Sequence, residues 1–296
     1  MKRLFEVVAV AAVALPLLTG LCQAADPARL YQDNCVACHG EGRLGGIGPA
    51  LLPENMGRLR GPAIAEVIAK GRDATQMPGF GQTLTGEDIA ALTAYITKPL
   101  AAMPTWGPME IAQSRTIERE VQPLARPVFA ADPMNLFVVV EIGDHHATIM
   151  DGDTLEPLVR FPTRFALHGG PKFTPDGRFV YFMSRDGWVE KYDIWTLQKI
   201  GEVRAGINAR NIALSSDGKH IAVANYLPNS LVILNAEDLT LERIFDAVDL
   251  KGKSSRVSAV YQARPRDSFV VALKDVREMW EIGTKHRSLS LCRLVL

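Results

Sequence analysis

The sequence lacks an excess of charge, a second metal-binding cysteine pair and a long apolar run. Its 33 lysines and arginines balance 33 aspartates and glutamates, so no basic field would attract nucleic acid or an anionic membrane, and we expect neither partner. No apolar run reaches the roughly 20 residues that a spanning helix needs. No second C-x-x-C or H-x-x-x-H completes a zinc set. The length of 296 residues allows two domains.

The first 24 residues have the pattern of a cleaved secretory signal. Two basic residues precede an apolar run over residues 7–18, and small or polar residues follow up to Ala24. A lipid anchor on Cys22 is the alternative, but bulky Leu21 occupies the position where such sites prefer a small residue. We therefore expect a mature chain that begins at Ala25, without a membrane anchor and in the periplasm.

Only two of the 4 cysteines form a group once the signal is removed, since Cys292 is isolated. They are Cys35 and Cys38, which His39 follows in the order C-x-x-C-H. A lone C-x-x-C can be a disulfide or a redox pair. The adjacent histidine favours covalent attachment of haem c, with two thioethers and His39 as the proximal iron ligand.

The surroundings of this motif favour a small helical cytochrome. Asp26 and Pro27 form a helix start, and a glycine-rich loop at 42–48 gives a macrocycle room to approach the backbone. Thr85 and Asp88 predict a capping box for a closing helix, whose buried face contains Ile89, Leu92 and Ile96.

Met77 is the expected sixth ligand of the haem c iron. It precedes a proline in a glycine-rich loop that no helix or strand would hold, and a thioether there is a soft axial ligand. A core methionine, or Met56 as the ligand, is the alternative. Residues 25–98 therefore resemble a class I cytochrome c, which transfers single electrons, and residues 99–126 are interpreted as a linker or strap.

The remaining sequence repeats. Asp132, Asp176 and Asp217 mark equivalent turns at spacings of 44 and 41 residues, each followed by three apolar strands. That period is typical of the blades of a β-propeller, and a fourth, incomplete unit extends to residue 282. We therefore expect an all-β propeller domain over residues 127–282.

His168 is a candidate ligand in this second domain. It lies in the connection to the second unit, where Gly169 and Gly170 leave space around it, although a simple turn-capping role is the alternative. His145 and His146 lie in a polar outer turn and are expected to be solvated.

Two stretches carry a specific resemblance: "FALHGGPKFTPDGRFVYFMSRDGWVEKYDIW" and "VRAGINARNIALSSDGKHIAVANYLPNSLVILNAEDL". They resemble the haem d1 domain that cytochrome cd1 nitrite reductases share with their maturation relatives. With a cytochrome domain in front, the chain is most similar to the dihydro-haem d1 dehydrogenases among them. The resemblance covers residues 25–282.

The resemblance implies roles for four residues. His168 matches the proximal iron ligand of haem d1, and Arg185 and Arg210 match arginines that pair with carboxylates of the tetrapyrrole. Tyr226 matches a pocket residue near the ring. For Arg185, a turn residue held by Asp186 remains the alternative.

The resemblance further implies an oxidoreductase that converts a propionate of dihydro-haem d1 to an acrylate and sends the electrons singly to haem c. Nitrite reductase is then a possible recipient of d1, and a small redox protein the acceptor of electrons. A non-enzymatic d1 carrier with a cytochrome head and a cytochrome cd1 nitrite reductase are the alternatives. No catalytic residue is assigned.

The family fold is an eight-bladed propeller, whereas this sequence contains about three to four units. Residues 283–296 do not look like the family, and we interpret the chain as truncated. We expect it to carry haem c but not to turn over dihydro-d1, because distal residues come from later blades. A closed four-bladed ring that uses the tail as a last strand is the alternative.

Overall fold

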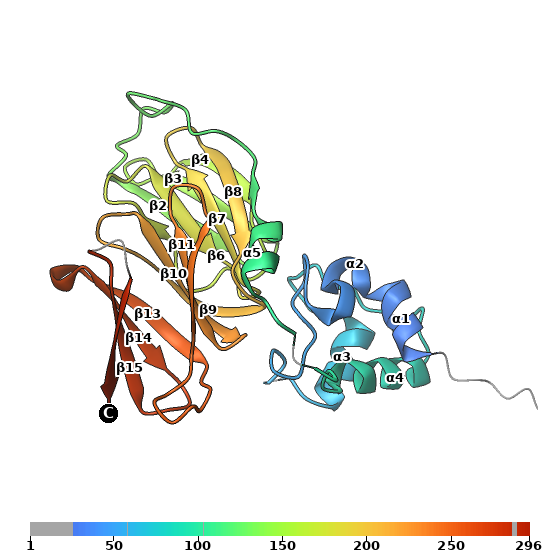
Figure 1. Cartoon of the computed structure of the whole chain (residues 1–296). Coiled ribbons are helices and arrows are strands. Elements are labelled where there is room, and N and C mark those ends of the chain that lie inside the picture. Colours follow the sequence, from blue (N-terminus) through green and yellow to red (C-terminus); the bar gives the residue numbers. More distant parts are fainter. Residues whose placement is uncertain (1–25, 58, 103, 286–288) are drawn as a thin grey trace, which may run out of the picture.

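The computed structural model describes residues 26–57, 59–102, 104–285 and 289–296. Short helices form the amino-terminal part and antiparallel sheets the rest, and the two parts lie side by side (Figure 1). This confirms the prediction of a helical domain followed by an all-β domain. The expected signal at residues 1–24 lies outside the described residues. Within the described ranges, no helix combines the length and apolarity needed to cross a bilayer.

The helical part contains α1 (Pro27–Asn34), α2 (Val36–His39), η1 (Glu41–Arg43), α3 (Pro62–Lys70) and α4 (Gly86–Thr97). The Asp26 carboxylate accepts a hydrogen bond from the backbone N–H of Ala28 and caps α1, as predicted. Thr85 and Asp88 form the predicted capping box of α4. One apolar core joins these helices and contains Tyr31, Ile64, Ile68, Ile89, Leu92 and Ile96.

The segment expected to be a linker contains secondary structure that the sequence did not predict. It holds α5 (Pro108–Ser114) and β1 (Thr116–Ile117), and β1 pairs antiparallel with β8 (Gln198–Arg204). Ile111 of α5 is 1% exposed and belongs to a core of the sheet domain. The segment is therefore a strap packed onto the sheets.

Four antiparallel sheets form the second part, and each follows the order of the chain. The first sheet contains β2 (Leu136–Glu141), β3 (His146–Asp151) and β4 (Pro157–Pro162). The second contains β5 (Lys172–Phe173), β6 (Phe179–Met183), β7 (Trp188–Asp193), β8 and the strap strand β1. The third contains β9 (Asn208–Leu214), β10 (His220–Leu227), β11 (Ser230–Asn235) and β12 (Leu241–Asp246). The fourth contains β13 (Val257–Ala263), β14 (Ser268–Leu273), β15 (Glu278–Gly283) and β16 (Ser290–Val295), with η2 (Arg264–Arg266) between its first two strands.

The three repeating aspartates form the same type of turn. Asp132 lies before β2, Asp176 before β6 and Asp217 before β10. Asp132, Asp176 and Asp217 each accept a hydrogen bond from the backbone N–H two residues further on, at 2.9, 3.1 and 3.1 Å. Such Asx turns set the chain up for the strand that follows. The repeat inferred from these aspartates therefore corresponds to a structural repeat.

The prediction that the fourth unit is incomplete is wrong for the described residues, whereas the prediction that residues 283–296 do not look like the family is not tested by the fold. The tail supplies β16, which pairs with β15 from Glu278↔Val295 to Gly283↔Ser290. The fourth sheet therefore has four strands. The weak alternation of the tail was a strand signal, and Cys292 lies exposed on it.

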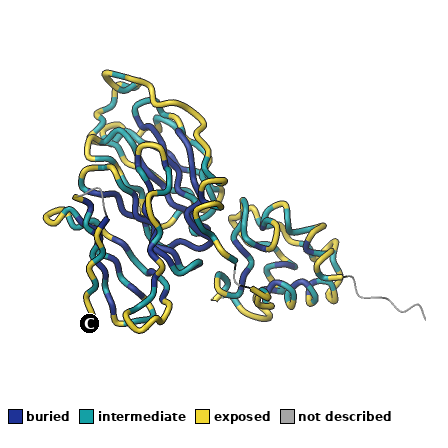
Figure 2. Tube along the Cα trace, in the orientation of Figure 1, coloured by how far each residue is buried: buried dark blue, intermediate teal, exposed yellow. Residues whose placement is uncertain are grey.

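Successive sheets pack face to face, so buried chain runs through the middle of the β part (Figure 2). On β6, Val180 and Phe182 pack toward the first sheet, whereas Tyr181 and Met183 pack toward the third. This alternation follows from the two-residue period of a strand. Both faces of the middle sheets are thus buried, and the loops at their ends remain available for a site.

Candidate haem-binding sites

The C-x-x-C-H motif lies at the junction of α1 and α2. The backbone N–H of Cys35 donates to the carbonyl of Tyr31 at 2.8 Å, and Cys38 and His39 lie in the single turn of α2. Both thiols are free and half-buried. Burial, and then the neighbouring Cys38, raises the pKa of Cys35 to about 11. A redox thiol pair needs a lowered pKa, so this environment suits covalent attachment better than disulfide exchange.

His39 has the orientation of an iron ligand. Its side chain is 7% exposed, and Nδ1 donates to the carbonyl oxygen of Pro49 at 2.8 Å. Burial lowers the pKa of His39, and the bond to Pro49 opposes that shift. The ring is therefore neutral with Nε2 as the remaining electron-pair donor, the form that binds a metal.

The loop after the motif packs so closely that only glycine fits at two positions. A Cβ at Gly48 would lie 3.0 Å from Cε1 of His39, and one at Gly40 would lie 2.3 Å from the carbonyl oxygen of Gly45. Gly40 also has φ +73°, a conformation that side chains disfavour. The glycines therefore bring the loop against the His39 ring, and their role in making space for a macrocycle stays a prediction.

Met77 lies in a tight loop between α3 and α4. Its carbonyl accepts a hydrogen bond from the backbone N–H of Arg72 at 3.1 Å, and the backbone N–H of Phe80 donates to Ile68 at 2.9 Å. Both bonds fold the loop back onto the end of α3. Met56, the alternative ligand, packs against the core of the helical part instead. This difference favours Met77 over Met56 as the ligand, because Met56 already serves the core.

The Met77 loop also approaches the sheet domain. A Cβ at Gly143, in the β2–β3 turn, would lie 2.7 Å from the carbonyl oxygen of Ala74. His145 and His146 in this turn are half-buried rather than solvated as expected. The ring of His145 packs edge-on against Phe165 at 5.3 Å. These histidines therefore have structural contacts.

His168 joins two sheets. Its backbone N–H donates to the carbonyl of Met183 at 2.7 Å, and its ring Nδ1 donates to the carbonyl of Arg210 at 2.6 Å. Burial, and then the positive charges of Arg185 and Arg210, lowers the pKa of His168. The exposed ring is therefore neutral, with Nε2 as its remaining electron-pair donor. Because the ring bonds to the next sheet, it does not act as a cap of its own turn.

Tyr226 lies at the centre of a group of cations. The Arg210 guanidinium lies 4.4 Å from the centre of the Tyr226 ring. The Arg256 guanidinium and the Lys274 ammonium each lie 5.1 Å from the same centre. Lys274 also donates to the Tyr226 hydroxyl at 2.8 Å. Such a group can hold a flat ring that carries carboxylates. The structure thus brings His168, Arg185, Arg210 and Tyr226 to one end of the second and third sheets.

No sequence pattern pointed to Arg256 and Lys274. They flank β13 and β14, and the backbone N–H of Lys274 donates to the carbonyl of Arg256 at 2.8 Å. Arg256 is paired with Asp275, and this pairing holds the pKa of Asp275 at about 2. Only the packing of β13 beside β9, where Asn211 accepts a hydrogen bond from Val260, brings these cations to Tyr226.

The two sites meet through the loop that follows the C-x-x-C-H motif. Ala50 and Leu52 of this loop are buried against Ile207 and Leu227, which lie at the ends of β9 and β10. Beside them, the side chain of Asn208 donates to that of Asn55 at 2.7 Å. The strands that carry Arg210 and Tyr226 therefore also receive the loop that follows His39.

Comparison with known proteins supports two haem domains. Residues 131–291 match the family model "Cytochrome D1 heme domain", which is more than half of the chain. Residues 23–96 match the model "Cytochrome C oxidase, cbb3-type, subunit III". The two matches cover the sheet part and the helical part.

Individual proteins are similar over nearly the whole chain. A "Dihydro-heme d1 dehydrogenase" of Pseudomonas aeruginosa is 55% identical over 91% of this chain and 56% of that protein. A "Nitrite reductase" of Stutzerimonas stutzeri is 25% identical over 94% of this chain and 51% of that protein. A solved structure, "Dihydro-heme d1 dehydrogenase NirN in complex with DHE", superposes with a TM-score of 0.87 at 53% identity, over 92% of this chain and 59% of that one. The chain thus spans little more than half the length of these relatives.

Proposed function

The chain belongs to the cytochrome d1 haem-domain family, and from this premise we propose that it carries the c-haem site and the d1-iron site of a periplasmic dihydro-haem d1 dehydrogenase. One observation supports this most strongly. His39 and His168 both donate from Nδ1 to a backbone carbonyl, of Pro49 and of Arg210, so each presents Nε2 to a metal. Two such histidines match two separate haem irons.

In the c-haem site, Cys35 and Cys38 would hold the macrocycle, and His39 and Met77 would bind its iron. When bound, haem c supplies a centre that accepts one electron at a time. The hydrogen bond from Nδ1 of His39 to the carbonyl of Pro49 orients the ring, and burial keeps it neutral. The backbone hydrogen bonds of the Met77 loop hold it against the end of α3.

In the d1 site, His168 would bind the iron, and Arg185 and Arg210 would hold carboxylates of the substrate. Tyr226, with Arg256 and Lys274 beside it, would provide further contacts to the substrate. Oxidation of a propionate to an acrylate releases two electrons and two protons, so the c-haem site must accept electrons in two successive steps. The residue that removes the protons is not assigned.

We further propose that the four sheets are blades of a propeller whose family form has eight. In this scheme residues 25–98 are the cytochrome domain, residues 99–126 the strap, and the blades begin near residue 127. Periplasmic location, nitrite reductase as the recipient of d1 and a small redox protein as the electron acceptor are parts of the same proposal.

A non-enzymatic d1 carrier is the second candidate, because its binding residues would be the same. Absorption spectra of the haem c-loaded chain, recorded with and without dihydro-haem d1, separate the two. A dehydrogenase converts the spectrum to that of d1 and reduces the c haem, whereas a carrier binds without either change. That this stretch of chain does not oxidise dihydro-haem d1 stays a prediction. Comparison of its turnover with that of a longer form tests it. Nitrite consumption by the loaded chain would instead favour a nitrite reductase.

A further inference from the structure

A single peptide group links the proximal histidine of the c-haem site to the sheet domain. The backbone N–H of Gly45 donates to the carbonyl of His39 at 2.8 Å. The carbonyl of Leu44, in the same peptide group, accepts a hydrogen bond from Nη2 of Arg204 at 2.5 Å. Two hydrogen bonds therefore separate the Arg204 guanidinium from the backbone of His39.

Arg204, at the end of β8, is held firmly in this position. It is 5% exposed, and its Nε donates to the carbonyls of Asp186 at 2.8 Å and of Gly206 at 3.1 Å. Its guanidinium lies 4.6 Å from the ring centre of Trp106, whose Nε1 donates to the Arg204 carbonyl at 2.8 Å. A planar guanidinium can make these bonds in fixed directions, which a lysine cannot.

The contact depends on close approach of the two backbones. Gly45 has φ +87°, and a Cβ there would lie 3.2 Å from Nη2 of Arg204 and 2.9 Å from the backbone nitrogen of Ala50. The carbonyl of Leu44 can reach the guanidinium because residue 45 has no side chain. Leu44 itself packs against the buried cluster that Ala50 and Leu52 form with the sheet domain.

On its other side, Arg204 contacts the turn that leads to the d1 site. Asp186, whose carbonyl accepts from Nε, directly follows Arg185. The carbonyl of Arg185 in turn accepts a hydrogen bond from the backbone N–H of Ala209, the neighbour of Arg210. A continuous series of hydrogen bonds thus connects His39, Arg204 and the segment that carries both arginines.

We propose that Arg204 is a positioning residue that fixes the c-haem loop against the d1-binding sheets and sets both the c-haem potential and the electronic coupling between the two sites. The part of this proposal that concerns the coupling rests on the proposed function, because it requires a bound haem d1. Its buried positive charge favours the reduced form of a nearby haem, which carries one positive charge less. The charged groups that act on Arg204 are the Asp186 carboxyl, which partly offsets this charge, and Arg164, which adds to it.

The test compares Arg204→Gln and Arg204→Lys in the haem c-loaded chain. Spectroelectrochemistry gives the c-haem potential without d1, and flash reduction of the d1-loaded chain gives the rate of electron transfer between the haems. We expect Arg204→Gln to lower the potential, because a buried positive charge is lost, and to slow the transfer, because the c-haem loop loses a hydrogen bond that holds it against the sheets. Arg204→Lys keeps the charge, so it should restore most of the potential but not the rate.

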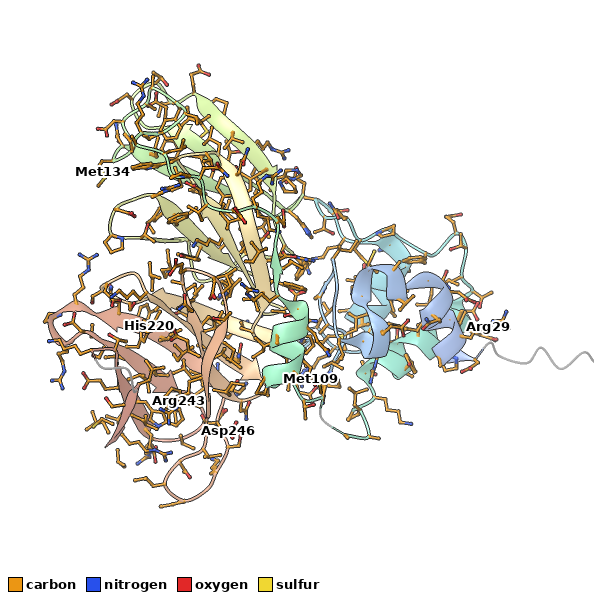
Figure 3. The ribbon with its side chains drawn as sticks, turned by 45° about the horizontal axis from the view of Figure 1, so that its top comes forward. Arg29, Met109, Met134, His220, Arg243 and Asp246 are labelled. Carbon is orange, nitrogen blue, oxygen red and sulfur yellow. The ribbon has the colours of Figure 1, made fainter. Side chains whose placement is uncertain are left out.

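Arg243→Gln is the matched control. The Arg243 guanidinium also lies 4.6 Å from an aromatic ring, that of Phe245, and donates to a distant carbonyl, that of Leu289 at 2.9 Å. It lies on β12 of the third sheet, apart from the amino-terminal helices (Figure 3). An unchanged potential in folded Arg204→Gln, or an equal drop in Arg243→Gln, would overturn the proposal. Failure of d1 to bind the unaltered chain would instead refute the proposed function, while the potentials still test Arg204.

Discussion

The imidazole Nδ1 of His168 lies 2.6 Å from the carbonyl oxygen of Arg210, 42 residues further along the chain. The bond crosses from the second sheet to the third, so the packing of two sheets fixes the direction of the ring. The bond from His39 to Pro49 does the same within the helical part, at 2.8 Å. Bonds of this kind typically change metal affinity 10- to 100-fold when they are removed.

His168→Ala should remove the d1 iron ligand and leave the c haem unaffected. We expect the affinity for haem d1 to fall by roughly 100-fold or more, since the ligand itself is lost. Titration of the loaded chain with d1 measures this in the d1 absorption bands. His146→Ala is the control, because its Nδ1 also bonds to a carbonyl, that of Asp144 at 2.9 Å. An unaltered d1 spectrum in His168→Ala would refute the assigned role.

Met77→Ala should keep the haem attached through Cys35 and Cys38 but lower its potential. Loss of a thioether ligand shifts a haem potential by on the order of tenths of a volt. Redox titration of the c band provides the measurement. Met56→Ala, at a methionine that packs in the helical core, should reduce stability and leave the potential nearly unchanged. The reverse pattern would identify Met56 as the ligand.

Lys274→Met should weaken d1 binding without loss of the fold. The Lys274 ammonium contacts the Tyr226 hydroxyl, and a charged hydrogen bond to a substrate carboxylate is worth about 1.5–3 kcal/mol. We therefore expect an affinity loss of roughly 10- to 100-fold in a d1 titration. Lys285→Met, which breaks the ion pair with Asp267, is the control. Equal affinities in both variants would show that the cations around Tyr226 do not contact d1.

Asp186→Asn should stabilise the protein above pH 6. The Asp186 carboxyl is 2% exposed, and one of its oxygens, Oδ2, is buried without a hydrogen-bond partner. Burial raises the pKa of Asp186 from 3.8 to about 6. Between these pH values the folded state binds more protons than the unfolded state, so the free energy of unfolding falls as the pH rises from about 4 to about 6.

The amide cannot ionise, so the variant avoids this cost, which amounts to at most about 3 kcal/mol at neutral pH. Urea unfolding of the haem c-loaded chain at pH 5 and pH 7.5 measures it. The gain should be larger at pH 7.5 than at pH 5. An Asp186→Asn variant that is less stable than the parent at pH 7.5 would show that the ionised carboxylate is needed, for example by Arg204.

Local signals in the sequence were sufficient for much of this architecture. The caps at Asp26 and Thr85 and the turns at the repeating aspartates each depend on residues only two or three positions apart, so a sequence pattern contains all the necessary information. The C-x-x-C-H motif is equally local. These elements were predicted correctly.

Features that depend on packing were missed. The strand β1 has two residues, too few for an alternating hydrophobic pattern. It forms because it pairs with the edge strand β8. The tail strand β16 was taken for an atypical segment, since its pairing with β15 decides its structure. Arg204 and Lys274 acquire their contacts from segments 160 and 48 residues away, respectively, which no local pattern encodes.

The central claim is that one chain joins a c haem at His39 to a d1 site at His168 so that electrons pass between them. The direct test loads the chain with haem c and haem d1, reduces the c haem with a light flash and follows both absorption bands. The account predicts that the c haem is reoxidised as d1 is reduced, at a rate independent of protein concentration, and that His168→Ala abolishes this exchange. A c haem that stays reduced beside bound d1, or a rate that rises with protein concentration, would contradict it.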